Sequence, residues 1–124
     1  MKTRIALAVV LLTSAGAAWA GRTNYFETSV DTVNKEAFGS LYDTRHSADN
    51  VQYIGCYINL IGGVARVNCE AKDAASDSLS CGSTNAELVK IAQSLSDSSY
   101  IFFRCDASFA LTYLYVSNNS VWLP

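Results

Sequence analysis

The segment VQYIGCYINLIGGVARVNCEAKD, from Val51 to Asp73, decides the fold. Apolar residues alternate with others on both sides of Gly62–Gly63, which predicts two β-strands joined by a tight turn. Strand side chains point alternately to the two faces of a sheet, and glycine readily adopts the positive φ that such a turn requires. This alternation places Cys56 and Cys69 on the same face of the hairpin, which we expect to be the buried one.

Three further strands follow this hairpin. The segment Leu79–Cys81 predicts a short strand, 100–106 a fourth and 109–117 a fifth, since β-branched and aromatic residues favour strands. The fourth strand alternates clearly between its two faces. In the fifth strand both faces are apolar, so the pattern does not assign Tyr113 and Tyr115 to the inward or the outward face.

A helix is predicted between the third and fourth strands. Thr84 is the expected N-cap, and Glu87, three residues later, completes a capping box. An apolar stripe with helical spacing follows, formed by Leu88, Ile91, Ala92 and Leu95.

The expected fold class is therefore mainly β with one helix, in the order β-β-β-α-β-β. This order resembles the OB-fold, a five-stranded barrel with a helix between its third and fourth strands. A curled antiparallel sheet covered by a helix gives the same order. We divide the chain into a signal peptide (1–20), an N-terminal extension (21–50) and a disulfide-stabilised β domain (51–124).

The first twenty residues, MKTRIALAVVLLTSAGAAWA, have the organisation of a secretory signal peptide. Lys2 and Arg4 precede an apolar run that is too short to span a bilayer, and Ala18–Ala20 supplies small residues for cleavage. We expect a mature chain that begins at Gly21, is periplasmic or secreted, and shows no stable membrane insertion after cleavage.

The charge balance disfavours nucleic acid as a partner. Without Lys2 and Arg4, seven basic residues remain against eleven acidic ones, so the mature chain carries a net charge of −4. Nucleic-acid binding normally requires a basic face that displaces phosphate counterions. The expected partner is instead a protein or glycan in the cell envelope or outside the cell.

Four cysteines in an exported chain predict two disulfides. Cys56, Cys69, Cys81 and Cys105 are separated by 13, 12 and 24 residues, which lacks the close pairs typical of zinc sites or redox motifs. No metal and no cofactor is predicted. We favour Cys69–Cys81 with Cys56–Cys105, since a barrel would make the first and fourth strands neighbours; Cys56–Cys69 with Cys81–Cys105 is the alternative.

The residues that could support hydrolysis form no recognisable motif. His46 is the only histidine and lies near Asp43. Glu70, Asp73 and Asp77 surround a second turn, predicted at 74–77 between the second and third strands. A catalytic triad depends on spatial geometry, which proximity in sequence does not provide. We therefore expect no enzymatic activity, with a small envelope-polymer hydrolase as the less favoured alternative.

Aromatic side chains are the better candidates for a binding site. Tyr53 and Tyr57 share the outward face of the first strand, and Tyr100, Phe102 and Arg104 share that of the fourth. If these strands pair, the side chains form one aromatic patch, which could stack on a ligand or dock onto a protein. The rings could also simply cover the barrel beneath the N-terminal segment.

Two segments, SADNVQYIGC and YLYVSNNS, resemble those of a family of small exported bacterial proteins without characterised function. This resemblance implies export and transfers no activity or site residue. The sequence thus predicts an exported non-enzymatic binding domain that recognises a protein or glycan through an aromatic strand face. A self-assembling structural envelope subunit is the alternative.

Overall fold

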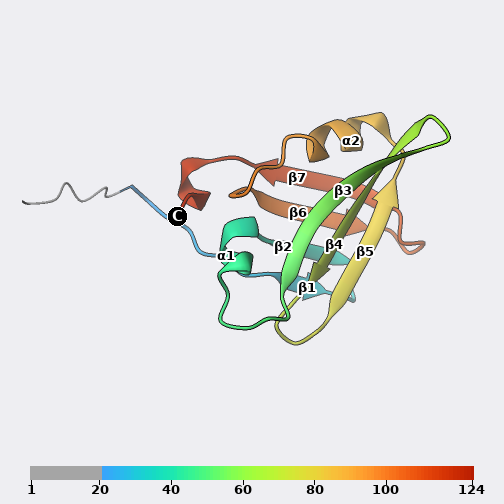
Figure 1. Ribbon diagram of the computed structural model, residues 1–124. Coiled ribbons are helices and arrows are strands. Elements are labelled where there is room, and N and C mark those ends of the chain that lie inside the picture. Colours follow the sequence, from blue (N-terminus) through green and yellow to red (C-terminus); the bar gives the residue numbers. More distant parts are fainter. Residues whose placement is uncertain (1–20) are drawn as a thin grey trace, which may run out of the picture.

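The computed structural model describes residues 21–124, which form two antiparallel β-sheets and two short α-helices that each contact both sheets (Figure 1). The predicted signal peptide, 1–20, lies outside the described residues. The elements are, in order, β1 (Ser29–Asp31), β2 (Glu36–Ser40), α1 (Leu41–Arg45), β3 (Tyr53–Ile61), β4 (Val64–Lys72), β5 (Ser78–Ser83), α2 (Ala86–Ala92), β6 (Tyr100–Cys105), β7 (Leu111–Ser117) and the 3₁₀ turn η1 (Ser120–Trp122).

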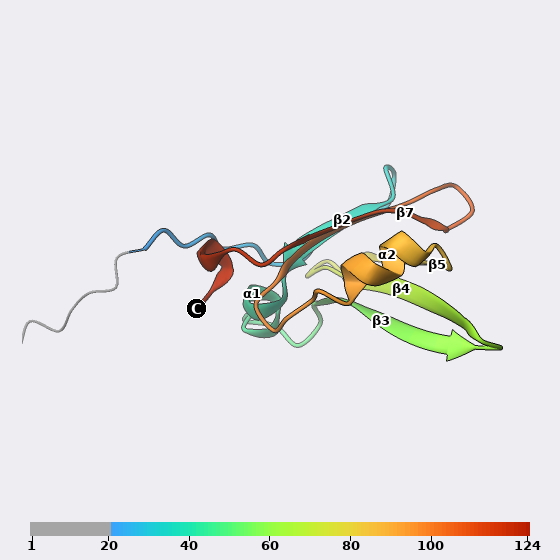
Figure 2. The same ribbon diagram turned by 90° about the horizontal axis from the view of Figure 1, so that it is seen from above.

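The sheets are layered, with the strand order β1-β2-β6-β7 in one and β3-β4-β5 in the other. Figure 2 shows the two layers, with α2 between them near one edge. The inward residues of both layers are fully buried, among them Val67 and Cys69 on β4 and Ile101 and Phe103 on β6. The main core therefore lies between the sheets.

The predicted mainly β class is confirmed, and from β3 to β7 the elements follow the predicted order, β3-β4-β5-α2-β6-β7. The prediction of one helix was incomplete, because α1 precedes this segment. The strands curl without closing into the OB-like barrel. Closure would need β3 beside β6, but β6 already has β2 on one side and β7 on the other. Both of its backbone edges are thus occupied, and within residues 21–124 β3 pairs only with β4.

The strand that occupies the place beside β6 comes from the segment interpreted as an N-terminal extension. Within 21–50 the chain forms β1, β2 and α1, and β2 pairs with β6 from Glu36↔Arg104 to Ser40↔Tyr100. Ala37 is buried against the core, and Gly39 lies close to the Thr28 backbone. This segment thus completes the four-stranded sheet.

All four cysteines form disulfides, but the favoured pairing was wrong. The bridges are Cys56–Cys69, with a Cα–Cα distance of 4.0 Å, and Cys81–Cys105, at 5.9 Å. Cys69 lies directly opposite Cys56 on one side and Cys81 on the other, so register alone does not choose between them. The position of β5 selects the pairing. Gly82, next to Cys81, forms a β-bridge with Ala110 just before β7, which brings the β5 edge close to the four-stranded sheet that holds Cys105.

The helix begins one residue later than predicted. Asn85, not Thr84, is the N-cap, and its side-chain oxygen accepts hydrogen bonds from the backbone N–H groups of Glu87 (2.9 Å) and Leu88 (3.3 Å). The predicted capping box is therefore absent, although asparagine caps helices as well as threonine does. The most deeply buried helix residues are Val89 and Ala92.

Gly82 is a position where a side chain cannot be accommodated without rearrangement. A Cβ atom there would lie 2.9 Å from the Val67 carbonyl oxygen, a backbone atom that cannot simply rotate away. We expect Gly82→Ala to lower the free energy of unfolding by about 1–3 kcal/mol, as overpacking does. Urea denaturation measures this. The matched control is Gly55→Ala in the same sheet, where the added Cβ meets no atom within 4 Å; equal losses for the two variants would contradict the prediction.

Candidate functional site

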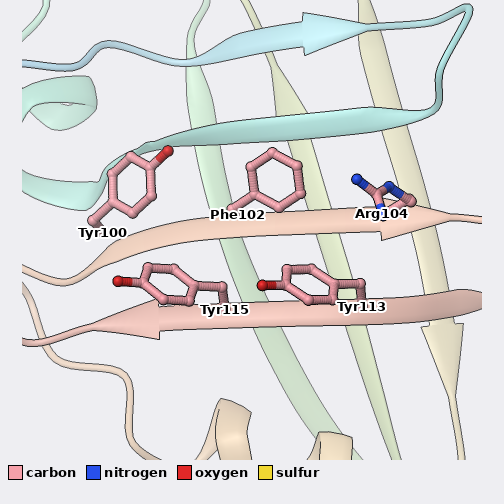
Figure 3. Close-up of a pocket in the computed structure, with 5 residues that line it drawn as sticks. All are labelled: Tyr100, Phe102, Arg104, Tyr113 and Tyr115. Atoms are coloured by element: carbon pink, nitrogen blue, oxygen red, sulfur yellow. The ribbon is translucent and has the colours of Figure 1, made fainter.

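The outer face of the four-stranded sheet carries a continuous group of aromatic side chains. We call this group the aromatic strip; its members are Phe38 on β2, Tyr100 and Phe102 on β6, and Tyr113 and Tyr115 on β7. The strip follows from strand alternation, because the residues between them, such as Phe103 and Leu114, point into the core. Figure 3 shows the β6 and β7 side chains side by side, with Arg104 at one end.

Cross-strand register brings these rings into contact. Phe102 lies opposite Phe38 on one side and Tyr115 on the other. The Phe38 and Phe102 rings are nearly parallel, at 7° with centroids 6.3 Å apart, whereas Tyr113 meets Phe102 edge-on at 82° and 5.7 Å. Tyr115 meets Tyr100 in a similar edge-on manner, at 72° and 6.2 Å. Such aromatic pairs hold one another in defined orientations.

The C-terminal turn closes one end of the strip. The Trp122 ring stacks on Tyr100 at 17° and 4.6 Å, and its indole N–H donates a hydrogen bond to Ser117 Oγ at 3.0 Å. Phe26, from the N-terminal segment, contacts both Tyr100 and Trp122. These contacts leave Tyr100 only half-exposed, and its burial, with a smaller effect of Tyr115, raises the pKa of its hydroxyl. This burial favours the neutral hydroxyl, which can donate a hydrogen bond.

An ion pair marks the other end. The Arg104 guanidinium bonds the Glu36 carboxylate through Nε (2.8 Å) and Nη2 (2.7 Å), both to Oε1. The guanidinium also lies over two rings of the strip, 5.6 Å from the Tyr113 centroid and 5.8 Å from that of Phe102. About half of the Arg104 side chain remains exposed, so the group combines a fixed orientation with access to ligands.

Between these ends, the β6 and β7 side chains line a shallow depression of about 330 Å³. Tyr113 and Tyr115 are each 45% exposed beside it, and their rings lie end to end along β7 (Figure 3). Two half-exposed rings, their hydroxyls and a guanidinium thus border one open surface. This arrangement suits a ligand with a flat apolar face and hydrogen-bonding groups on its rim.

The residues expected to form one patch lie on two different sheets. Tyr100, Phe102 and Arg104 belong to the four-stranded sheet, whereas Tyr53 and Tyr57 lie on β3, on the outer face of the other sheet. The assumed pairing of the first and fourth strands was wrong, because β2 and β7 occupy both sides of β6. Tyr53 and Tyr57 are 44% and 52% exposed, and they lie opposite the polar residues Lys72 and Asn68.

Three members of the strip are not predicted from the sequence: Tyr113, Tyr115 and Phe38. Tyr113 and Tyr115 could not be given a face, because the inward residues between and beyond them, Leu114 and Val116, are equally apolar. A register irregularity between Arg104 and Cys105 further obscures the alternation. The contribution of Phe38 depends on β2 joining the sheet, for which the sequence holds no local signal.

His46 lies on the surface at the end of α1. Its ring stacks on Tyr42 with centroids 4.0 Å apart, and its Nδ1 lies 2.8 Å from the Tyr42 carbonyl oxygen. Asp43 is buried and accepts a hydrogen bond from the Phe26 backbone N–H at 2.9 Å. Within residues 21–124, His46 forms no hydrogen bond with a carboxylate. The Asp43 carboxylate instead anchors the N-terminal segment.

Of the three carboxylates around the second turn, that of Asp73 organises the turn, whereas Glu70 lies within β4, opposite Ser80. Asp73 Oδ1 accepts a hydrogen bond from the Asp77 backbone N–H at 2.9 Å, and the Asp73 N–H donates to the Asp77 carbonyl oxygen at 3.0 Å. Ser76, between them, adopts a φ of 69°, which the turn requires. Across the part of the chain that the structure describes, no group of three or more potential metal ligands gathers.

Comparisons with protein families, curated proteins and solved structures each found no match. None of the helices in residues 21–124 has the length and apolar character needed to cross a bilayer. The two disulfides are consistent with an exported protein, because such bonds persist in oxidising compartments.

Proposed function

We propose that this protein is an exported, non-enzymatic domain that binds its partner through the aromatic strip. The observation that carries the proposal is the pair Tyr113 and Tyr115, half-exposed side by side next to the oriented guanidinium of Arg104. Aromatic rings held in place by their neighbours provide large contact areas at a small entropic cost on binding. The partner is a glycan or protein in the envelope or outside the cell, as the sequence suggested.

The shape of the strip favours a glycan. The depression of about 330 Å³ is open and shallow, so it accepts a chain-like ligand that lies along the strand. A sugar ring has an apolar C–H face, which can cover an aromatic ring, and equatorial hydroxyls, which can bond to groups at its edge. The tyrosine hydroxyls and the Arg104–Glu36 pair supply those edge groups.

Export to the periplasm or outside the cell accords with this role. The N-terminal sequence has the organisation of a cleavable signal peptide, and the disulfides Cys56–Cys69 and Cys81–Cys105 suit an oxidising compartment.

Binding can be followed with a probe that the protein already contains. Trp122 is the one tryptophan of residues 21–124, and it stacks on Tyr100 at the end of the strip. We expect soluble fragments of envelope polysaccharide to change its fluorescence. Tyr115→Ala should weaken this binding about tenfold or more, the effect of losing roughly 1.4 kcal/mol at a central contact.

The matched control is Tyr57→Ala, which removes a ring of similar exposure from the opposite sheet. It should leave the affinity unchanged. Equal losses for Tyr57→Ala and Tyr115→Ala, or no loss for either, would contradict the proposed site. If polysaccharide fragments do not bind but an envelope protein is captured by the unmodified domain and not by Tyr115→Ala, the strip recognises a protein.

A further inference from the structure

The hairpin of β3 and β4 extends beyond the third strand of its sheet. The last pair between β4 and β5 is Val67↔Ser83, whereas β3 and β4 continue to Ile61↔Val64. We call residues 59–66 the hairpin tip. It projects from the body at the end far from the C-terminus (Figures 1 and 2).

The hairpin tip exposes apolar side chains to an unusual degree. Leu60 is 70% exposed, Ile61 67% and Val64 52%, and Ile58, at its base, is 38% exposed. A hollow of about 460 Å³ separates Val64 and Ala65 of the tip from α2, so the helix does not pack closely on this side of the tip. Leaving several large apolar groups in water is unfavourable, and such a cluster typically marks a contact surface.

These side chains occupy both faces of the hairpin. Leu60 pairs with Ala65 on the face that also carries Cys56, whereas Ile61 pairs with Val64 on the opposite face. A protein partner, or a second copy that extends the sheet, would cover one face or one edge. A lipid environment surrounds the tip on all sides and therefore matches an apolar surface that wraps around it.

Charge is distributed as a bilayer contact requires. The segment 57–65 contains no charged residue, and the first charge next to it is Arg66. Arg66 is exposed and forms no ion pair within residues 21–124. When the apolar end of the tip enters the hydrocarbon layer, the Arg66 guanidinium at its base lies at the level of the phosphate headgroups, where a cation is stabilised.

We infer that the hairpin tip inserts into the surface of a lipid bilayer and holds the domain there reversibly. The three residue pairs beyond β5 span about 10 Å at the usual rise of a strand, which matches the depth of interfacial segments. The unpaired backbone groups at the hairpin edges prevent deeper entry. The contact is thus shallow and differs from a membrane-spanning insertion.

This inference does not depend on the proposed function, because the aromatic strip lies on the other sheet. A domain attached through the hairpin tip keeps the strip accessible to a partner. Tyr115→Ala, which tests the strip, should therefore leave lipid binding unchanged.

Vesicle flotation tests the inference directly. The exported protein, confirmed by mass spectrometry to begin at Gly21 and to hold both disulfides, is mixed with phosphatidylcholine vesicles containing one third phosphatidylglycerol. We expect it to float with the vesicles, and expect Leu60→Asp/Ile61→Asp to reduce the bound fraction at least tenfold. The control Val33→Asp changes an 87%-exposed valine in the β1–β2 turn and should float like the unmodified protein.

A second variant reports on the tip itself. Leu60→Trp should show a blue-shifted emission with vesicles and be quenched by lipids brominated near the headgroup, while Trp122 should not. Three results would overturn the inference: no flotation of the unmodified protein, equal flotation of Leu60→Asp/Ile61→Asp, or an unquenched tryptophan at position 60. Concentration-dependent dimers that disappear in the double variant, without flotation, would assign the tip to self-association instead.

Discussion

Replacing Cys81 and Cys105 together with alanine is expected to lower the free energy of unfolding by about 3.5 kcal/mol. The two cysteines are 24 residues apart in sequence, and their bridge joins β5 in one sheet to β6 in the other. It limits the unfolded chain and, in the native state, fastens the two layers at their buried faces. A domain of this size has roughly 5–15 kcal/mol in total, so the loss is a large share.

Urea denaturation of the purified variant measures this loss, and thermal unfolding should show a decrease in Tm of roughly 15 °C. The matched control is Cys56→Ala/Cys69→Ala, which opens a loop of 13 residues. From loop length alone its loss is smaller by about 0.5 kcal/mol, and the turn at Gly62–Gly63 already holds that hairpin together. A control that loses more than the Cys81/Cys105 variant would contradict the assignment of the sheet-to-sheet bridge as the stronger constraint.

Phe103→Ala is expected to lower the free energy of unfolding by about 3–5 kcal/mol, because it leaves a cavity between the sheets. Phe103 is fully buried, and it lies opposite Ala37 on β2 and Leu114 on β7. Those two residues are themselves held by backbone ladders, so they cannot move far to fill the space. Chemical denaturation followed by Trp122 fluorescence measures the effect.

The neighbouring residue provides the control for Phe103. Phe102 is on the same strand but points to the aromatic strip, where it is half-buried. Phe102→Ala should cost about 1 kcal/mol, near the average for point substitutions, and should reduce ligand binding at the strip. Phe103→Leu, which keeps most of the volume, should cost less than about 1.5 kcal/mol. Similar losses for Phe102→Ala and Phe103→Ala would show that the inward and outward assignments are incorrect.

Local patterns in the sequence were sufficient for the strands whose two faces differ chemically. In β4, alanine, valine and cysteine alternate with charged or polar residues, and the buried positions Val67, Cys69 and Ala71 follow that alternation. The same holds for β6, where Ile101 and Phe103 are buried as expected. For such strands, the residue types on one face identify it as the core side.

Strand partners were harder to predict, because pairing depends on distant segments. No residue of β6 specifies β2 instead of β3 as the neighbouring strand, and β2 is a short segment in a polar region. The expected disulfide pairing and the expected single aromatic patch both depend on β3 lying beside β6, so both were wrong. Within β7, similar hydrophobicity on the two faces left Tyr113 and Tyr115 unassigned.

The position of β2 beside β6 has a consequence for how the protein matures. The residues paired between these strands are 60 to 68 positions apart, from Ser40 and Tyr100 to Glu36 and Arg104. A chain that emerges with its amino end first therefore has no partner for β2 until most of its length has appeared. Folding dominated by such distant pairings is slow, so the two layers can assemble only after the segment that contains β6, Tyr100–Cys105, has emerged.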